Sequence, residues 1–217
     1  MIRLVVADDH TIVREGLKQL LGAAGDLEVV GEASDGGQVM ERVRALDFDV
    51  LLLDMSMPGR SGIELIRQVR AEKAKLRILV LSMHEEHQYA VRAIRAGASG
   101  YLTKESASRQ LVEAIRKVAG GGAFISAEVA QQLALGAMPD AKGPPHAALS
   151  DREFQIFRMI ADGLSVSDIA ARLSLSVKTV STHKTRILEK MGLANQAELV
   201  RYALEHRLLD DSAKPSA

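Results

Sequence analysis

The sequence predicts a doubly wound α/β domain with a parallel five-stranded sheet, followed by an all-α domain of four helices. Three observations lead to this prediction. Strand-like and helix-like stretches alternate over roughly the first 120 residues. After a segment that combines proline, glycine and charge at 138–146, the pattern is helical only. The length of 217 residues, against about 150 for a usual domain, fits one large domain or two small ones.

Five apolar runs, rich in Val, Leu and Ile, predict the strands of the first domain. Continuous apolar runs are typical of parallel strands that are buried on both faces. The runs are Ile2–Ala7, Leu27–Ala33, Val50–Leu53, Ile78–Leu81 and the shorter Tyr101-Leu102.

Amphipathic stretches after these runs predict five helices. They are Val13–Leu21, Val39–Leu46, Ile63–Val69, Tyr89–Ile94 and Leu111–Val118. Glycines at 120–122 end the fifth helix, and a short helix is predicted over Glu128–Leu135. The strand–helix alternation predicts a doubly wound domain, for which we expect the flavodoxin-like strand order, 2-1-3-4-5.

The second domain begins with a capping box, in which Ser150 is the N-cap and Glu153 the third helical residue. Gly163 ends this first helix. A second helix is predicted over Ser167–Leu173, and after a turn Ser176 caps a third helix that ends at Met191; the fourth is Glu198–Leu208. Two helices joined by such a short turn indicate a helix-turn-helix.

These patterns predict the domain boundaries. Residues 1–122 form the α/β domain, 123–148 a linker with a short helix, 149–210 the helical domain and 211–217 a disordered tail.

Composition excludes several classes of protein. The chain has no cysteine, which excludes disulfide scaffolds, thiolate metal sites and cysteine nucleophiles. Its 47% hydrophobic and 26% charged residues are typical of a globular protein rather than a disordered one. The first apolar run stops at Asp8-Asp9, and no signal peptide or membrane span is evident, so we expect a cytoplasmic protein without a membrane partner.

Three acidic residues follow predicted neighbouring strands. Asp8 and Asp9 end the first strand and Asp54 ends the third. Ligands of open α/β sheets bind at the carboxyl ends of the strands, where these carboxylates would converge. Their mutual repulsion is relieved by a cation, and oxygen ligands select a hard one such as Mg²⁺. The alternative is that Asp8 or Asp9 only caps a helix and Asp54 begins a turn.

The motifs resemble those of a known family. Asp8-Asp9, LLLDMSMPGRSG around Asp54, LVLSMHE around Ser82 and GYLTK ending at Lys104 resemble the receiver domain of bacterial two-component response regulators. The stretch from LSDREF to EKMGL resembles the LuxR-type helix-turn-helix. This pairing, which covers essentially the whole chain, is similar to the NarL/FixJ subfamily.

The resemblance implies a role for four residues. Asp54 would be the nucleophile that accepts a phosphoryl group from the phosphohistidine of a sensor histidine kinase. Lys104 would pair with the phosphoryl group, and the Ser82 hydroxyl would donate a hydrogen bond to it. Tyr101 matches the family's switch aromatic, which turns inward when that hydroxyl moves. The chain would be a phospho-acceptor with slow autodephosphorylation rather than an enzyme.

The resemblance also implies a metal site. Asp8 or Asp9, Asp54 and the backbone carbonyl of Ser56 would hold Mg²⁺. One position departs from the family pattern, because many receivers have a proline after the lysine, in a cis peptide. Here Glu105 follows Lys104, and a cis bond before a non-proline residue costs about 2.5–4 kcal/mol.

The third helix of the second domain carries a basic stripe. Ile169–Leu188 contains four basic residues and no acidic one. A helical wheel predicts one apolar stripe that faces the core: Val177, Val180, Ile187, Leu188 and Met191. The opposite face holds Lys178, Ser181, Thr182, Thr185 and Glu189.

This opposite face predicts contacts with the major groove, because small hydroxyl residues lower helix propensity unless close approach requires them. Lys178 and Arg186 are suited to contact DNA phosphates, and Lys184 can extend from the apolar edge of the helix to reach another phosphate. His183 is interpreted as a packing or backbone contact. A solvated helix that binds nothing is the alternative.

The favoured function is a phosphorylation-switched transcription factor. Its partners would be a sensor histidine kinase, double-stranded promoter DNA, a second copy of the chain on phosphorylation, and RNA polymerase as a candidate. An aspartate-nucleophile phosphohydrolase would need an acid two residues after Asp54, where Ser56 stands. A LuxR-type sensor of an apolar ligand conflicts with the acidic pocket and the missing aromatic cavity.

Overall fold

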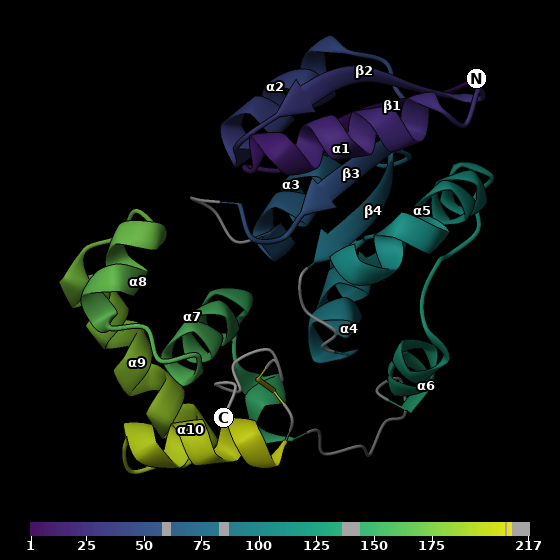
Figure 1. Cartoon of the computed structure of the whole chain (residues 1–217). Coiled ribbons are helices and arrows are strands. Elements are labelled where there is room, and N and C mark those ends of the chain that lie inside the picture. Colours follow the sequence, from purple (N-terminus) through teal and green to yellow (C-terminus); the bar gives the residue numbers. More distant parts are fainter. Residues whose placement is uncertain (58–61, 83–86, 136–143, 207, 210–217) are drawn as a thin grey trace, which may run out of the picture. The chain divides into compact units, whose positions relative to one another are not determined.

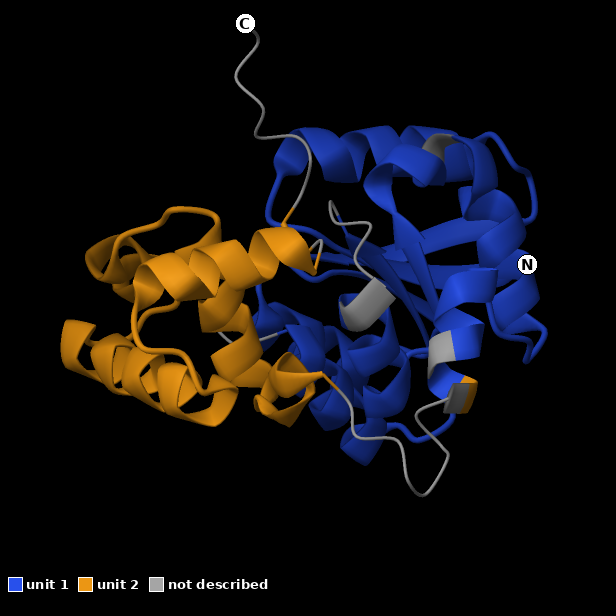
Figure 2. Cartoon of the chain, turned by 90° about the horizontal axis from the view of Figure 1, so that it is seen from below, with its two compact units in different colours: residues 1–133 blue, residues 134–217 orange. Residues whose placement is uncertain are grey.

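The computed structural model describes residues 1–57, 62–82, 87–135, 144–206 and 208–209. The chain divides into two compact units, residues 1–133 and 134–217 (Figure 2). The finer boundaries at 122, 148 and 210 stay predictions. The segment 136–143 of the predicted linker and the predicted disordered tail, 211–217, lie outside the described residues.

The first unit contains the predicted parallel sheet, in the order β2-β1-β3-β4-β5 (Figure 1). Its strands are β1 (Ile2–Ala7), β2 (Leu27–Ala33), β3 (Val50–Asp54), β4 (Arg77–Ser82) and β5 (Gly100–Thr103). Every residue of β3 is buried, which explains its unbroken apolar sequence.

Helices cover both faces of this sheet (Figure 1). They are α1 (Thr11–Gly22), α2 (Gly36–Ala45), α3 (Gly62–Glu72), α4 (His87–Ala96) and α5 (Lys104–Ala119). One hydrophobic cluster joins α1 and α5 to the sheet, and its members include Leu21 of α1, Ile115 of α5 and Leu52 of β3. The helix α6 (Ala127–Leu135) follows, close to its predicted bounds.

Helix α5 begins seven residues earlier than the Leu111 that periodicity predicted. The side chain of Thr103 accepts a hydrogen bond from the Ser106 backbone N–H and so caps the helix directly after β5. Lys104 is therefore the first helical residue. Its peptide bond to Glu105 is trans, because the described residues include no cis peptide.

The second unit contains the four predicted helices, preceded by a short 3₁₀ helix, η1 (Pro145–Ala148). They are α7 (Asp151–Ala161), α8 (Val166–Arg172), α9 (Val177–Met191) and α10 (Gln196–Glu205). The fourth was predicted to run to Leu208 but ends at Glu205. Beyond this end, the Leu208 backbone N–H donates to the Ala203 carbonyl at 2.7 Å, and the Leu208 side chain is buried. Leu208 therefore contributes to the cap of the helix and is not part of it.

The predicted capping box of α7 also fixes α9. Glu153 Oε2 accepts from the Ser150 backbone N–H at 2.8 Å and from Lys190 Nζ at 2.7 Å. Burial raises the pKa of Glu153, but the hydrogen bonds from Lys190 and Ser150 outweigh this, so its pKa lies below the usual value. The carboxylate therefore stays ionised at neutral pH and holds the end of α9 against the start of α7.

Candidate functional site

The sheet brings two of the predicted acidic residues to one edge. Strands β1 and β3 are neighbours, and Ala7 pairs with Leu53, so Asp8 and Asp54 occupy equivalent positions one residue further along. Both residues are only 1% exposed. Two carboxylates buried this deeply require positive charge or hydrogen bonds close by.

Lys104 supplies that charge from the start of α5. Its Nζ lies 2.6 Å from Asp8 Oδ2 and 3.0 Å from Asp54 Oδ2. The sequence separates Lys104 from Asp8 by 96 positions and from Asp54 by 50. The fold therefore assembles three of the predicted site residues into one ion-paired group at the carboxyl edge of the sheet.

Backbone donors orient the remaining carboxylate oxygens. Asp54 Oδ1 accepts from the Ser56 N–H at 3.0 Å, and Asp8 Oδ1 accepts from the His10 N–H at 2.8 Å. Arg14 Nη1 donates to the Asp8 carbonyl at 2.7 Å and holds the chain in place where β1 ends. Each carboxylate thus has one oxygen directed at Lys104 and the other at a backbone N–H.

Asp9 lies beside this group with a different environment. Its side chain is 29% exposed, and its Oδ1 lies 3.0 Å from His10 Nδ1. This oxygen is itself buried and has no hydrogen bond. Ligand atoms of Asp8, Asp9, His10 and Asp54 all lie within 4.8 Å of one another. This donor set, which consists mostly of oxygens and includes one unsatisfied oxygen, fits a hard divalent cation.

Electrostatics at the group leave negative charge in excess. Burial raises the pKa of Asp54 above its usual value, although Lys104 and the Ser56 N–H act in the opposite direction. Burial also lowers the pKa of Lys104, but its contacts with Asp8 and Asp54 outweigh this, and the net pKa is raised. One ammonium therefore faces two buried carboxylates, with a third at Asp9, so a further positive charge is favoured here.

Ser82 and Tyr101 lie on the next strands of the same sheet. Asp54 pairs with Leu81, which puts Ser82, the last residue of β4, at the edge that carries the carboxylates. Ser82 is fully buried and Tyr101 is 9% exposed. Tyr101 lies two residues before the end of β5, where its N–H donates to the Phe124 carbonyl at 2.8 Å. The switch roles of these two residues stay predictions.

The second unit presents the predicted basic helix, α9. Ser176 caps it by accepting from the Thr179 N–H at 3.0 Å, and Ser174, in the preceding turn, has a φ of 53°. The predicted contact residues are exposed on α9 except for Lys184: they are Lys178, Ser181, Thr182, Thr185 and Arg186. Half-buried Lys184 donates to Gln196 Oε1 at 2.7 Å, so its Nζ contacts α10.

The predicted apolar stripe of α9 is correct at its centre and wrong at its start. Val180 and Ile187 are fully buried and Met191 is 6% exposed, whereas Leu188 is half-buried. Val177 is 52% exposed. The wheel places Val177 on the stripe, but it is the first residue of the helix and extends beyond the core that Val180 enters. His183 is half-buried, and desolvation lowers its pKa, which agrees with a packing role.

Comparison with known proteins decides the family. Residues 4–116 match the response regulator receiver domain, and residues 147–203 match the bacterial regulatory proteins of the luxR family. Response regulator UvrY of Escherichia coli K12 is 39% identical over 209 residues, which are 96% of each chain. Response regulator GacA of Pseudomonas aeruginosa is 39% identical over 211 residues, or 97% of this chain and 99% of GacA.

The chain belongs to the NarL/FixJ family of response regulators. Among solved structures, the Salmonella typhimurium response regulator RcsB has a TM-score of 0.71 and 29% identity, over 94% of this chain and 97% of RcsB. RcsB from Salmonella enterica serovar Typhimurium, bound to the promoter rprA with phosphomimetic BeF₃⁻, has a TM-score of 0.66 and 29% identity, over 93% and 98% of the two chains.

This response regulator therefore has a receiver domain and a LuxR-type DNA-binding domain. Within the described ranges, no helix has the length and apolar character needed to cross a membrane.

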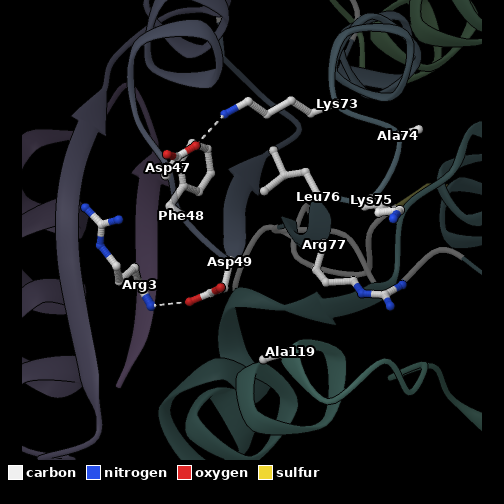
Figure 3. Close-up of a pocket in the computed structure, with 10 residues that line it drawn as sticks. All are labelled: Arg3, Asp47, Phe48, Asp49, Lys73, Ala74, Lys75, Leu76, Arg77 and Ala119. Atoms are coloured by element: carbon white, nitrogen blue, oxygen red, sulfur yellow. Dashed lines mark hydrogen bonds and ion pairs between the residues drawn. The ribbon is translucent and has the colours of Figure 1, made fainter.

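A hollow of about 540 Å³ lies at the opposite edge of the receiver sheet (Figure 3). Asp49, just before β3, accepts from the Arg3 N–H at 2.8 Å, and Arg77 begins β4. Lys73 Nζ lies 3.5 Å from Asp47 Oδ1 on the rim. These are the amino ends of the strands, whereas ligands of open α/β sheets bind at the carboxyl ends. The candidate site of the response regulator is therefore the acidic group.

Sequence reasoning missed His10 in that group. Its backbone N–H orients Asp8, and its Nδ1 lies within 3.2 Å of both Asp8 Oδ1 and Asp9 Oδ1. The signal was present, because a third metal-binding side chain directly follows Asp8-Asp9. The sequence does not show where this side chain lies; the turn between β1 and α1 places the imidazole beside the carboxylates of Asp8 and Asp9.

Proposed function

We propose that this chain is a phosphorylation-dependent transcription regulator in which Asp54 accepts a phosphoryl group from a sensor histidine kinase. Phosphorylation then promotes dimerisation and binding to promoter DNA. The observation that carries the proposal is the convergence of Asp8 and Asp54 on Lys104, at the carboxyl edge of the receiver sheet, in a chain with a LuxR-type domain. RcsB, which was solved with promoter DNA and phosphomimetic BeF₃⁻, supports it.

Asp54 is suited to be the acceptor. A carboxylate oxygen of Asp54 attacks phosphorus, the phosphorus–nitrogen bond of the kinase phosphohistidine breaks, and the imidazole nitrogen leaves with the electron pair. The Ser56 N–H orients the Asp54 carboxylate during this step. Lys104, now paired with two carboxylates, holds the negative phosphoryl oxygens, and Ser82 donates a hydrogen bond to one of them.

The metal proposed for this step is Mg²⁺, which neutralises phosphoryl charge when bound. Asp8, Asp9 and Asp54 would hold it together with the backbone carbonyl of Ser56. The exposed side of Asp9 and its unsatisfied Oδ1 support a ligand role, directly or through water. Both Asp8 oxygens already accept hydrogen bonds, from Lys104 Nζ and from the His10 N–H, so Asp8 and Asp9 both stay candidates for direct coordination.

Tyr101 is proposed to carry the change away from the site, by turning inward when Ser82 moves toward the phosphoryl group. The aspartyl phosphate would hydrolyse slowly, which returns the protein to its resting state. The partners that follow are the kinase, promoter DNA, a second copy of the chain and, as a candidate, RNA polymerase. The proposed location is the cytoplasm.

The test of this function compares the full-length protein with and without acetyl phosphate and Mg²⁺. We expect phosphorylation to shift the sedimentation coefficient from monomer to dimer and to lower the Kd for promoter DNA by at least about tenfold, because one dimer engages two half-sites. A promoter site comes from in vitro selection on random duplex DNA. An unchanged sedimentation coefficient together with an unchanged Kd would contradict the proposal.

Helix α9 is proposed to lie in the major groove. Lys178 and Arg186 would contact phosphates, as would Lys184 once it leaves Gln196. The hydroxyl residues differ in what they can offer a base. Thr182 Oγ1 donates to the Lys178 carbonyl at 2.9 Å and Thr185 Oγ1 to the Ser181 carbonyl at 3.2 Å.

The hydroxyl protons of Thr182 and Thr185 are therefore engaged, and these two hydroxyls can only accept a hydrogen bond from a base. In the part of the chain that the structure describes, the hydroxyl of Ser181 makes no hydrogen bond. Ser181 can donate to a base or accept from one, so it is the strongest candidate for base recognition.

Two substitutions on α9 are expected to have different effects. Lys178→Ala should weaken binding to all sequences alike and reduce the slope of log K against log salt by about one unit, because one phosphate contact is lost. Ser181→Ala should change the base preference at one position and leave the slope unchanged. Thr182→Ala should change the base preference less. Fluorescence anisotropy on a set of single-base variants at several salt concentrations measures both. An unchanged slope in Lys178→Ala would contradict its phosphate role.

A further inference from the structure

The first residue of α9 exposes an apolar side chain. Val177 is 52% exposed and is one of four large hydrophobic residues that the described part of the chain leaves exposed, with Met1, Ile12 and Leu204. Three residues further on, Val180 is fully buried, so the core of this unit begins one turn after Val177.

Local structure does not explain a valine at this position. The start of α9 is set by Ser176, whose hydroxyl accepts from the Thr179 N–H and lies 2.8 Å from Thr179 Oγ1. A β-branched residue in a helix loses rotamer freedom, and here burial does not repay the loss. An alanine or a charged residue would favour this helical turn more.

Val177 lies where the apolar stripe of α9 borders the proposed DNA-contacting face. Lys178 is next in sequence, and Ser181 lies one turn further along the same side of the helix; both are exposed. The amino-terminal residues of a recognition helix are the ones that approach base edges. In the major groove, the apolar feature of the bases is the C5-methyl group of thymine, which small apolar side chains contact.

We propose that Val177 is a specificity-determining residue that recognises one thymine in each half-site through its C5-methyl group. The proposal rests on the proposed DNA-binding function of α9. Val177 would then discriminate against cytosine, which lacks the methyl group, while Ser181 forms hydrogen bonds to a neighbouring base. Contact with that base edge removes the exposed methyl groups of Val177 from water.

The test uses the phosphorylated full-length protein and a duplex from in vitro selection, in which each thymine of a half-site is replaced in turn by deoxyuridine. This replacement removes only the methyl group and keeps base pairing. We expect one replacement to weaken binding of the wild-type protein by about fourfold, the effect of burying one methyl group. In Val177→Ala, the same replacement should have no further effect. Alanine favours an exposed helical turn, so this variant is expected to fold.

Ile12→Ala is the matched control, since Ile12 is an exposed, branched residue in the first turn of a helix in the other unit. Replacing the sensitive thymine by deoxyuridine should weaken DNA binding by this variant about fourfold, as it does for the wild-type protein. If every replacement weakens Val177→Ala as much as it weakens the wild-type protein, the role of Val177 is wrong while DNA binding stands. If no duplex is selected at all, the proposed DNA-binding function fails first.

Discussion

Asp54→Asn is expected to reduce labelling by radioactive acetyl phosphate, in the presence of Mg²⁺, by more than about 100-fold. An amide is a poor nucleophile, and it cannot serve as a charged ligand for the metal. The substitution keeps the size of the side chain and leaves Asp8 paired with Lys104 at 2.6 Å, so the receiver is expected to fold. Incorporation of label per chain, measured after gel filtration, gives the result.

Asp47→Asn is the matched control for this experiment. Asp47 is the same residue type, its side chain is 97% exposed, and it lies at the opposite edge of the sheet (Figure 3). We expect full labelling of this variant. Undiminished labelling of Asp54→Asn would show that another residue accepts the phosphoryl group, and would overturn the proposed role of Asp54.

Phe157→Ala is expected to lower the free energy of unfolding of the second unit by about 3–5 kcal/mol. Phe157 is completely buried, with a relative exposure of 0%. Its ring centroid lies 5.9 Å from that of Phe154 and 6.5 Å from that of Tyr202. Removing the ring leaves a cavity between α7 and α10. The loss is a large part of the 5–15 kcal/mol that holds a typical domain together, so DNA binding should fall with it.

Hydrogen exchange of the α7 and α10 amides in increasing urea measures this loss separately from the receiver. Leu204→Ala on α10 is the control, because Leu204 is 61% exposed, and its cost should stay within about 0.5 kcal/mol. A cost below about 1 kcal/mol for Phe157→Ala would mean that the second unit does not depend on this aromatic core.

Local sequence patterns determined the fold and the two buried carboxylates of the acidic site. The strand bounds at Ile2–Ala7 and Leu27–Ala33 agree with prediction. β1 is buried from Leu4 onward, as expected for an inner parallel strand, whereas the edge strand β2 is buried only at its two ends. The capping box at Ser150 could be predicted as well, since its hydrogen bonds join residues three apart. Asp8 and Asp54 could be predicted to meet because the strand order alone aligns the carboxyl ends of β1 and β3.

Other features depend on which surface another element covers, and only the tertiary structure decided them. Periodicity began α5 at Leu111, but the cap at Thr103 begins it at Lys104, and that start brings the ammonium between two carboxylates 50 and 96 positions away. A helical wheel assigns Val177 to the core side because it records angle and not where the neighbouring helices stop. The side chain lies beyond the reach of the core, since burial depends on contacts between residues distant in sequence.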